Sequence, residues 1–90
     1  MNRIENLIVI NDFNYIKEVL AWIFVTYDES HEIFKVNIRS RGPIINETAE
    51  KYNGGGHKFA SGARCKTESE INNLLKDLDK VCKNYKESLE

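Results

Sequence analysis

The sequence is poor in cysteine, in proline and in long apolar runs. Its two cysteines, Cys65 and Cys82, form no Cys-x-x-Cys pair, which argues against a disulfide scaffold and against structural zinc. We expect both thiols to be reduced. The longest apolar run, Val19 to Val25, is far shorter than the roughly 20 residues that span a bilayer, and Met1 begins no signal-peptide pattern. We therefore expect a cytoplasmic protein without a membrane partner.

The chain also lacks an excess of one charge. Thirteen Lys and Arg face 14 Asp and Glu, which leaves a net charge of −1. This balance argues against a broad basic surface that attracts nucleic acid or membrane. The charges are unevenly placed, however, because residues 35–66 hold seven basic and only two acidic side chains. This locally positive segment predicts one site for an anionic ligand.

Length and pattern predict a single domain over residues 1–90 with an α/β (α+β) fold, in which helices pack on a small mixed β-sheet of about three to five strands. The apolar run 20–27 predicts a central strand that is buried on both faces. The alternating segment 33–41 predicts a second strand, antiparallel to the first, and 60–66 a third. Residues 4–13 could form a helix or a strand, and their apolar spacing favours the helix.

Two further helices are expected after the second strand. Asn46 can cap a short helix that runs to Tyr52 and is ended by Gly54 in the left-handed C′ position. Thr67 and Glu70 form a capping box before a long amphipathic C-terminal helix, whose apolar stripe runs over residues 71–89. We expect this last helix to pack on the sheet.

Three consecutive glycines followed by a histidine are hard to explain by folding alone. A glycine costs about 0.5–1 kcal/mol relative to Ala when it is ordered, so we interpret the run as backbone kept bare for a ligand. Successive N–H groups can form an anion nest, and a neighbouring imidazole and hydroxyl add donors. The alternative is a flexible turn. The candidate residues here are Gly54, Gly55, Gly56, His57 and Ser61.

Arg39, Ser40 and Arg41 end the second predicted strand, so the two guanidinium groups leave the same face two residues apart. Guanidinium groups bind phosphate oxygens in a bidentate manner, and one short helix connects this strand end to the glycine run. We predict one phosphate held from both sides. The alternative is a solvated strand face with ion pairs to Glu47 or Glu50.

The remaining candidates receive a structural interpretation. General surface charge is the interpretation for Lys58, Arg64 and Lys66. Core packing is the interpretation for Trp22, Phe24 and Phe34. His31 is assigned to a solvated turn. Tyr27 and Tyr52 are better candidates for stacking on a base. No His and Asp pair has metal-ligand spacing and no Ser-His-Asp arrangement occurs, so we expect no catalytic residue, metal or other cofactor in this chain.

Together, Arg39-Ser40-Arg41, Gly-Gly-Gly-His at residues 54–57 and Ala-Ser-Gly-Ala at 60–63 resemble the DHH-associated accessory domain of DHH-family phosphoesterases. The resemblance covers most of the chain from about Leu20. Its nearest subgroup is the bifunctional oligoribonuclease and phosphoadenosine phosphatase (nanoRNase) type. It implies that Arg39, Ser40 and residues 54–57 bind substrate phosphate or sugar and are not metal ligands.

In that family an amino-terminal DHH domain holds two manganese ions and cleaves the phosphoester, while the accessory domain grips the nucleotide. The Asp-His-His segment does not occur in this sequence. The resemblance therefore implies a carboxy-terminal fragment of a longer hydrolase, which is not catalytic alone. Its expected partners are short RNA or a nucleotide phosphate such as phosphoadenosine phosphate, and the N-terminal DHH catalytic domain of the parent chain.

Related domains also end alanyl-tRNA synthetases, where they serve tRNA contact and self-association. The alternative is therefore a self-standing RNA-binding or dimerisation module, with a homodimer as a further expectation. Salt dependence separates the two hypotheses, because a module that tracks a long strand releases many counterions and a pocket for one or two nucleotides releases few.

Overall fold

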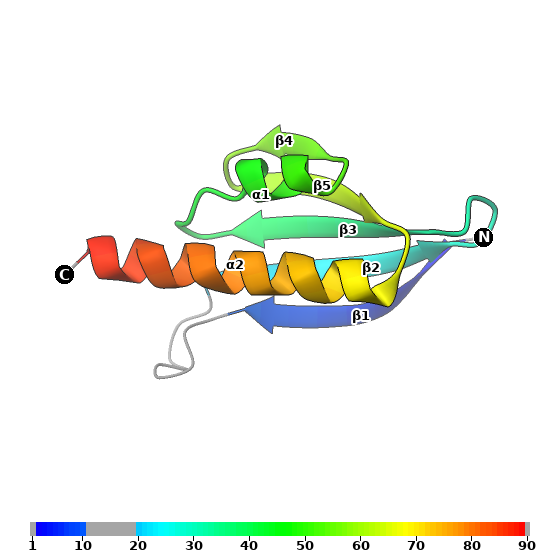
Figure 1. Ribbon diagram of the computed structural model, residues 1–90, viewed down its shortest axis with the longest axis horizontal. Coiled ribbons are helices and arrows are strands. Elements are labelled where there is room, and N and C mark those ends of the chain that lie inside the picture. The colour runs from blue at the N-terminus through cyan, green and yellow to red at the C-terminus, as the bar shows by residue number, and fades with distance from the viewer. Residues whose placement is uncertain (1, 11–19, 90) are drawn as a thin grey trace.

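A computed structural model describes the backbone of residues 2–10 and, with side chains, residues 20–89. Within these residues the chain forms five strands and two helices (Figure 1). In chain order they are β1 (Asn2–Ile10), β2 (Ala21–Asp28), β3 (Ile33–Ser40), α1 (Asn46–Lys51), β4 (Gly55–His57), β5 (Ala60–Cys65) and α2 (Glu68–Ser88). The strands form one sheet in the order β1-β2-β3-β5-β4. The predicted α+β class is confirmed.

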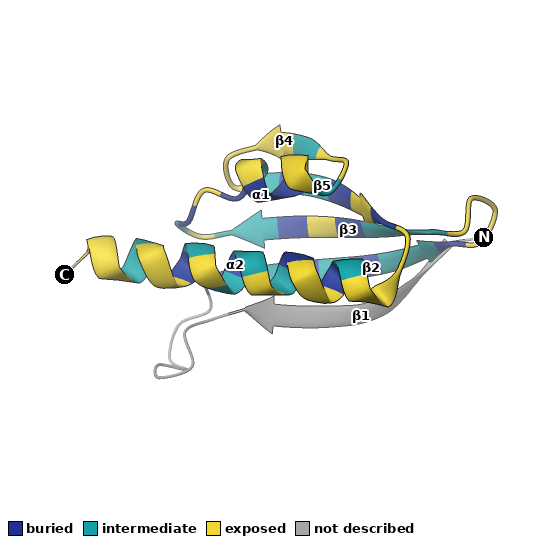
Figure 2. Ribbon diagram, viewed as in Figure 1, coloured by how far each residue is buried: buried dark blue, intermediate teal, exposed yellow. Residues whose placement is uncertain are grey.

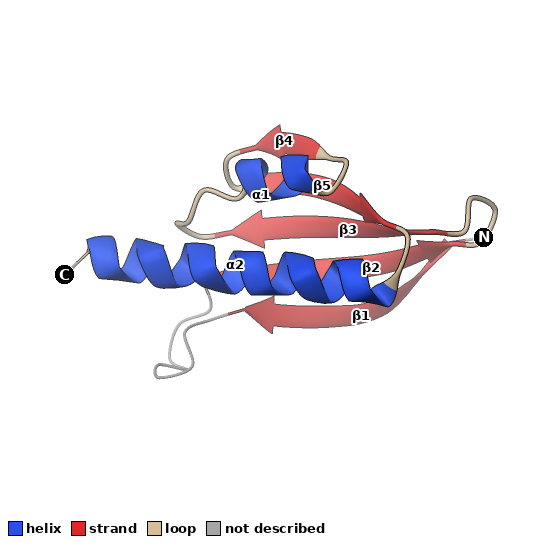
Figure 3. Cartoon of the chain, viewed as in Figure 1, coloured by secondary structure: helices blue, strands red, loops and turns tan. Residues whose placement is uncertain are grey.

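All strand pairs of this sheet are antiparallel, where the sequence analysis expected a mixed sheet. Both helices lie on the same side of it (Figure 3). The long helix α2 crosses one face, and α1 lies beside it over β5 and β4. Among the described residues, no helix lies on the opposite face of the sheet (Figure 3), so the two faces have different surroundings.

The hydrophobic core lies between the sheet and α2 (Figure 2). Alternate residues of β2 and β3 are buried there, including Ile23 and Ile38, which pair across the strands and are both 0% exposed. From α2 the predicted stripe contributes the buried side chains Ile71, Leu74, Leu78 and Cys82. Leu89, the last residue of the predicted stripe, is 68% exposed and lies outside the core.

The start of α2 follows the predicted capping pattern. The backbone N–H of Glu70 donates to Thr67 Oγ1 at 3.2 Å, and the Glu70 carboxylate accepts from the backbone N–H of Lys66 at 3.3 Å. The first bond satisfies a donor that the first turn of a helix leaves free, and the second reaches the residue before the N-cap, one position earlier than in a standard capping box. At the other end of α2, a side chain at Gly42 would meet the Tyr85 hydroxyl at 2.5 Å, so Tyr85 lies directly on the turn after β3.

The cysteines are unpaired, as the sequence predicted. Cys65 of β5 and Cys82 of α2 are both buried in the core. Burial raises the pKa of each thiol to about 11, because the thiolate would lose its hydration. Both groups are therefore neutral packing residues at physiological pH.

Two predictions about strands were wrong. Residues 4–10 belong to strand β1, which pairs with β2 from Asn2 opposite Asp28 to Ile10 opposite Ala21; residues 11–13 of the predicted helix lie outside the described residues. The β-branched run at 8–10 therefore outweighed the helical spacing. Strand β2 is buried on one face only, because Trp22 and Phe24 are partly exposed on the face without helices.

The predictions for the ends of α1 were also wrong. Ile45 is the N-cap and makes no side-chain capping bond, whereas Asn46 is the first helical residue. The left-handed position after the helix is held by Asn53, at φ 60°, and not by Gly54. Asn tolerates this conformation better than most residues with a side chain, so a glycine is not needed there.

Candidate functional site

One row of paired residues brings the predicted arginine and histidine to the same face of the sheet. Arg39 on β3 pairs with Ala60 on β5, and Ala60 pairs with His57 on β4. Residues that pair directly across antiparallel strands point to the same face, here the one without helices. Arg39 and His57 are therefore two strand spacings apart, about 10 Å between backbones, with only a methyl group between them.

The two arginines differ in their surroundings. Arg39 is half-buried, and its Nη1 donates to the carbonyl of Ile38 at 3.0 Å. Arg41 lies beyond the end of β3 and is exposed, while its backbone N–H still donates to the carbonyl of Leu20 at 2.9 Å. In the described part of the chain, neither guanidinium forms the ion pair with Glu47 or Glu50 that was the alternative.

Part of the glycine run lies in a strand, whereas the sequence analysis considered an anion nest or a flexible turn. Gly55 and Gly56 lie in β4, which pairs with β5 as the last strand of the sheet. A Cβ at Gly54 would lie 1.8 Å from the carbonyl oxygen of Gly62, and Gly56 has φ 145° with the carbonyl oxygen of Ala60 2.9 Å from a Cβ position. Packing therefore explains two of the three glycines.

Gly55 is the exception in this run. A Cβ there would meet only the Glu50 Cγ, at 3.8 Å, which is an ordinary contact distance. Packing therefore gives no reason for a glycine at this position, and a ligand against the bare backbone stays a prediction.

The two predicted serines are bonded within the chain. Ser40 Oγ donates to the carbonyl of Pro43 and accepts from the backbone N–H of Gly42 at 3.1 Å, which closes the turn after β3. Ser61 is 4% exposed, and its Oγ donates to the carbonyl of His57 at 2.6 Å. These hydroxyls hold the two segments that carry Arg41 and His57.

The tip of the β4–β5 hairpin is tied to the same turn. The backbone N–H of Ser40 donates to the carbonyl of Phe59 at 2.9 Å, and that of Ile45 to the carbonyl of Lys58 at 2.8 Å. Phe59 and Ile44 are half exposed, at 49% and 48%. These two exposed apolar residues belong to the segments that the hydrogen bonds join, and the sequence analysis had not singled them out.

A groove of about 430 Å³ adjoins that row. It is lined by side chains and backbone from β3, β5 and the start of β4: Lys35, Val36, Asn37, Asn53, Gly54, Gly55, Gly62, Ala63 and Arg64. The sequence analysis assigned Arg64 to general surface charge and did not identify the groove. The feature of the sequence that could have indicated the groove is the alternation that places Lys35, Asn37 and Arg39 on one strand face.

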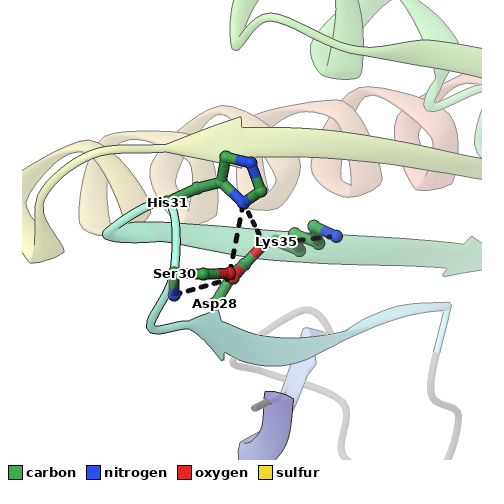
Figure 4. A network of polar contacts seen from close by, with 4 residues as sticks. All are labelled: Asp28, Ser30, His31 and Lys35. Carbon is green, nitrogen blue, oxygen red and sulfur yellow. Dashed lines mark hydrogen bonds and ion pairs between the residues drawn. The ribbon is translucent and has the colours of Figure 1, made fainter.

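A polar cluster lies at the end of this face nearest the β2–β3 turn (Figure 4). The buried carboxylate of Asp28 accepts from Ser30 Oγ at 2.8 Å and lies 2.9 Å from His31 Nδ1 and 3.6 Å from Lys35 Nζ. The Ser30 hydrogen bonds hold the pKa of Asp28 well below its usual range, burial opposes them, and His31 lowers it further. His31 is exposed, as predicted, but it is not without a partner.

The aromatic residues are only partly as expected. Tyr52 packs against the core and its hydroxyl donates to Asp77 at 2.6 Å, while burial, followed by Asp77, raises its pKa to about 12. Tyr27 contacts Phe34, with ring centroids 4.9 Å apart. Trp22 and Phe24, which were assigned to the core, instead lie partly exposed on the face without helices.

Residues 20–89 offer neither a metal site nor a membrane span. No group of three or more His, Cys, Asp and Glu residues there could hold a metal ion. No helix in this part of the chain is long and apolar enough to cross a membrane.

Comparison with known proteins gives a family. A model of the DHHA1 domain matches residues 2–84. The bifunctional oligoribonuclease and PAP phosphatase NrnA of Bacillus subtilis is 43% identical over 70 residues, which is 78% of this chain and 22% of the relative. The NrnA of Mycoplasma pneumoniae is 35% identical over 71 residues, 79% of this chain and 22% of the relative.

A probable NrnA of Streptococcus mutans is 32% identical over 80 residues, which is 88% of this chain and 25% of the relative. The chain thus spans a quarter or less of the length of these relatives. Since the family model covers nearly the whole chain, the chain belongs to the DHHA1 domain family, in the form found in NrnA-type DHH phosphoesterases.

Proposed function

We propose that this domain holds the phosphorylated end of a short oligoribonucleotide or of a nucleotide such as phosphoadenosine phosphate. The observation that carries the proposal is the row Arg39–Ala60–His57, which presents a guanidinium and an imidazole on one face with a small residue between them. Arg39 provides a fixed charge, and His57 is exposed and provides a ring N–H donor.

The surroundings of the row support this role. Ala60 leaves space above the sheet, so an anion can lie between the two side chains and be contacted by both. Arg41 adds a second positive charge on the adjoining turn, whose shape is set by Ser40 and Pro43. Gly54 and Gly56 position the β4 strand, and Ser61 fixes the carbonyl of His57. These three act on the site through the backbone.

Hydrolysis belongs, in this proposal, to the part of the relatives that this chain does not span. The Asp-His-His segment is not in the sequence, and the resemblance places the two manganese ions of the reaction on an amino-terminal DHH domain. The chain is then the substrate-binding domain of a longer manganese-dependent phosphoesterase. Its other partner is the catalytic domain of the same polypeptide.

Titration of phosphoadenosine phosphate into the 90-residue chain, followed by amide chemical shifts, tests the proposal. We expect shifts at Gly55 and His57, and the Arg39→Ala variant should bind more weakly by about 1.5–3 kcal/mol, the range for a charge-assisted hydrogen bond. Its melting temperature should stay nearly constant. Lys83→Ala, on an exposed position of α2, is the matched control and should leave the affinity unchanged.

Two results would contradict the proposal. Absence of shifts at Gly55 and His57 would remove the site. Equal losses of affinity and stability in Arg39→Ala would identify Arg39 as a structural residue. A steep salt dependence with long RNA, together with weak binding of the mononucleotide, would favour the alternative of a general RNA-binding module.

A further inference from the structure

Two of the five glycines have no packing reason to be glycine, and they are paired with each other. Side chains at Gly42, Gly54 and Gly56 would meet atoms of the chain at 3.0 Å or less. At Gly55 and Gly62 the nearest atoms lie 3.8 Å away, and neither residue has a left-handed φ. Gly55 and Gly62 face each other across β4 and β5 and form the floor of the 430 Å³ groove.

Two cations stand beside this floor. Lys35 on β3 and Arg64 on β5 are directly paired across the strands, an arrangement of like charges that disfavours the sheet. Asp28 compensates Lys35 in part, at 3.6 Å, whereas Arg64 forms no ion pair with any described residue. An anion in the groove would relieve the repulsion between the two side chains.

The groove continues the row that holds Arg39 and His57. Along β3, Lys35 lies four residues from Arg39, with Asn37 midway, so the two positively charged rows are about 13 Å apart on the same face. Asn37 pairs with Gly62, and its amide faces the groove between the two positive rows. An extended single strand of nucleic acid, with regularly spaced phosphates, fits this arrangement.

We infer that the groove is a second nucleotide subsite, which binds an internal phosphodiester of an oligoribonucleotide whose terminal phosphate lies at Arg39 and His57. Lys35 and Arg64 contact this phosphodiester, Asn37 offers its amide, and the floor of Gly55 and Gly62 admits the sugar-phosphate backbone. The inference rests on the proposed function and extends it. It assigns the domain a preference for oligonucleotides long enough to reach both rows over mononucleotides.

Binding of a 5′-phosphorylated mononucleotide and a 5′-phosphorylated trinucleotide to the same variants tests the inference. For the wild type, we expect the trinucleotide to bind more tightly. Arg64→Gln should weaken the trinucleotide about tenfold and leave the mononucleotide within about twofold, because one charge-assisted contact is lost. It should also lower the slope of log affinity against log salt by about 0.7, the value for one phosphate of a single strand.

Gly62→Ala provides an independent arm that changes no charge. A Cβ there would occupy the groove floor without meeting the chain, so this variant should keep or raise its melting temperature and bind the trinucleotide more weakly. Lys83→Gln on α2 removes a positive charge on the other side of the molecule and should change neither ligand's affinity.

The outcomes separate the two claims. If Arg39→Ala weakens both ligands and the groove variants weaken only the trinucleotide, the inference is supported. If the groove variants change both ligands equally or change neither, or if a pentaglutamate peptide binds as tightly as the trinucleotide, the subsite is overturned and the proposed function stands. If the wild type binds neither nucleotide, the proposed function is overturned and the subsite with it.

Discussion

The two faces of the sheet contrast in what their side chains contact. On the face covered by α2, Ile23 and Ile38 are fully buried in an apolar core. On the opposite face, at alternate positions of β3, Lys35, Asn37 and Arg39 are partly or largely exposed. Neighbouring residues of one strand thus belong either to the core or to the candidate site, because strand geometry sends their side chains to opposite sides.

This division means that stability and binding can be changed separately. Burial of apolar area stabilises the domain from one side of the sheet, whereas the charges that define the candidate site are on the other. The following variants test how complete the separation is.

The largest loss of stability is expected from a cavity under α2. Ile38→Ala should reduce the free energy of unfolding by about 2–5 kcal/mol, because the side chain is fully buried and its space cannot be refilled. Asn37→Ala, its exposed neighbour on the other face, should change stability by less than about 0.5 kcal/mol. Urea denaturation of both variants measures the contrast, which fails if the two losses are similar.

The next effect distinguishes two glycines that lie close together. Gly54→Ala should cost about 1–3 kcal/mol or more, because the new Cβ would collide with the backbone of Gly62. Gly62→Ala should stabilise the chain by about 0.4–1 kcal/mol, since it restricts the unfolded chain without a clash. Thermal unfolding measures the expected decrease in stability for Gly54→Ala and the expected increase for Gly62→Ala. A stable Gly54→Ala variant would mean that β4 can move away from β5.

A smaller effect concerns the helix that covers the core. Thr67→Ala removes the acceptor for the Glu70 backbone N–H and should lower the free energy of unfolding by about 1 kcal/mol. Thr67→Ser retains the hydroxyl and serves as the control. Ligand affinity should remain that of the wild type in both variants, and a loss of affinity would show that α2 acts on the opposite face.

The smallest effect on the free energy of unfolding is expected from acid, through Asp28 on the face without helices. The pKa of Asp28 is lower in the folded chain than in the unfolded chain, so its contribution to stability is present above the ordinary carboxyl pKa near 4 and is lost as the pH falls below it. Denaturation at pH 6, 4 and 3 should show this loss, and Asp28→Asn should show less of it. An equal pH dependence in the variant would assign the acid sensitivity to other carboxylates.

Regular patterns made much of the fold predictable from the sequence. Alternation over residues 33–41 identified β3, and the cap at Thr67 with its apolar stripe identified α2. Strand β1 was mistaken for a helix because its apolar spacing matched both periods, and only pairing with β2 decides between them. Strand β4 has no side-chain signal for a strand, since its Gly-Gly-His segment pairs through the backbone alone.

The sequence named most residues of the candidate site but did not explain why each of them lies where it does. The proximity of Arg39 and His57 could be anticipated from the motifs, but the register that puts both in one row requires the β3–β5 pairing. A side chain at Gly54 or Gly56 would clash with the backbone of β5, whereas one at Gly55 would not. Such contacts between segments cannot be recognised from the local sequence. The groove was missed because Lys35 and Arg64 are 29 positions apart and meet only through the sheet.

The contact between Tyr85 and Gly42 connects the last turns of α2 with the bend that carries Arg41. The family match ends at residue 84, one position before this tyrosine. A chain trimmed to the matched region would keep every recognisable motif and yet lose the aromatic ring that supports the bend. Changes at the carboxyl end of the helix, including fused tags, can therefore be felt where the ligand is proposed to bind.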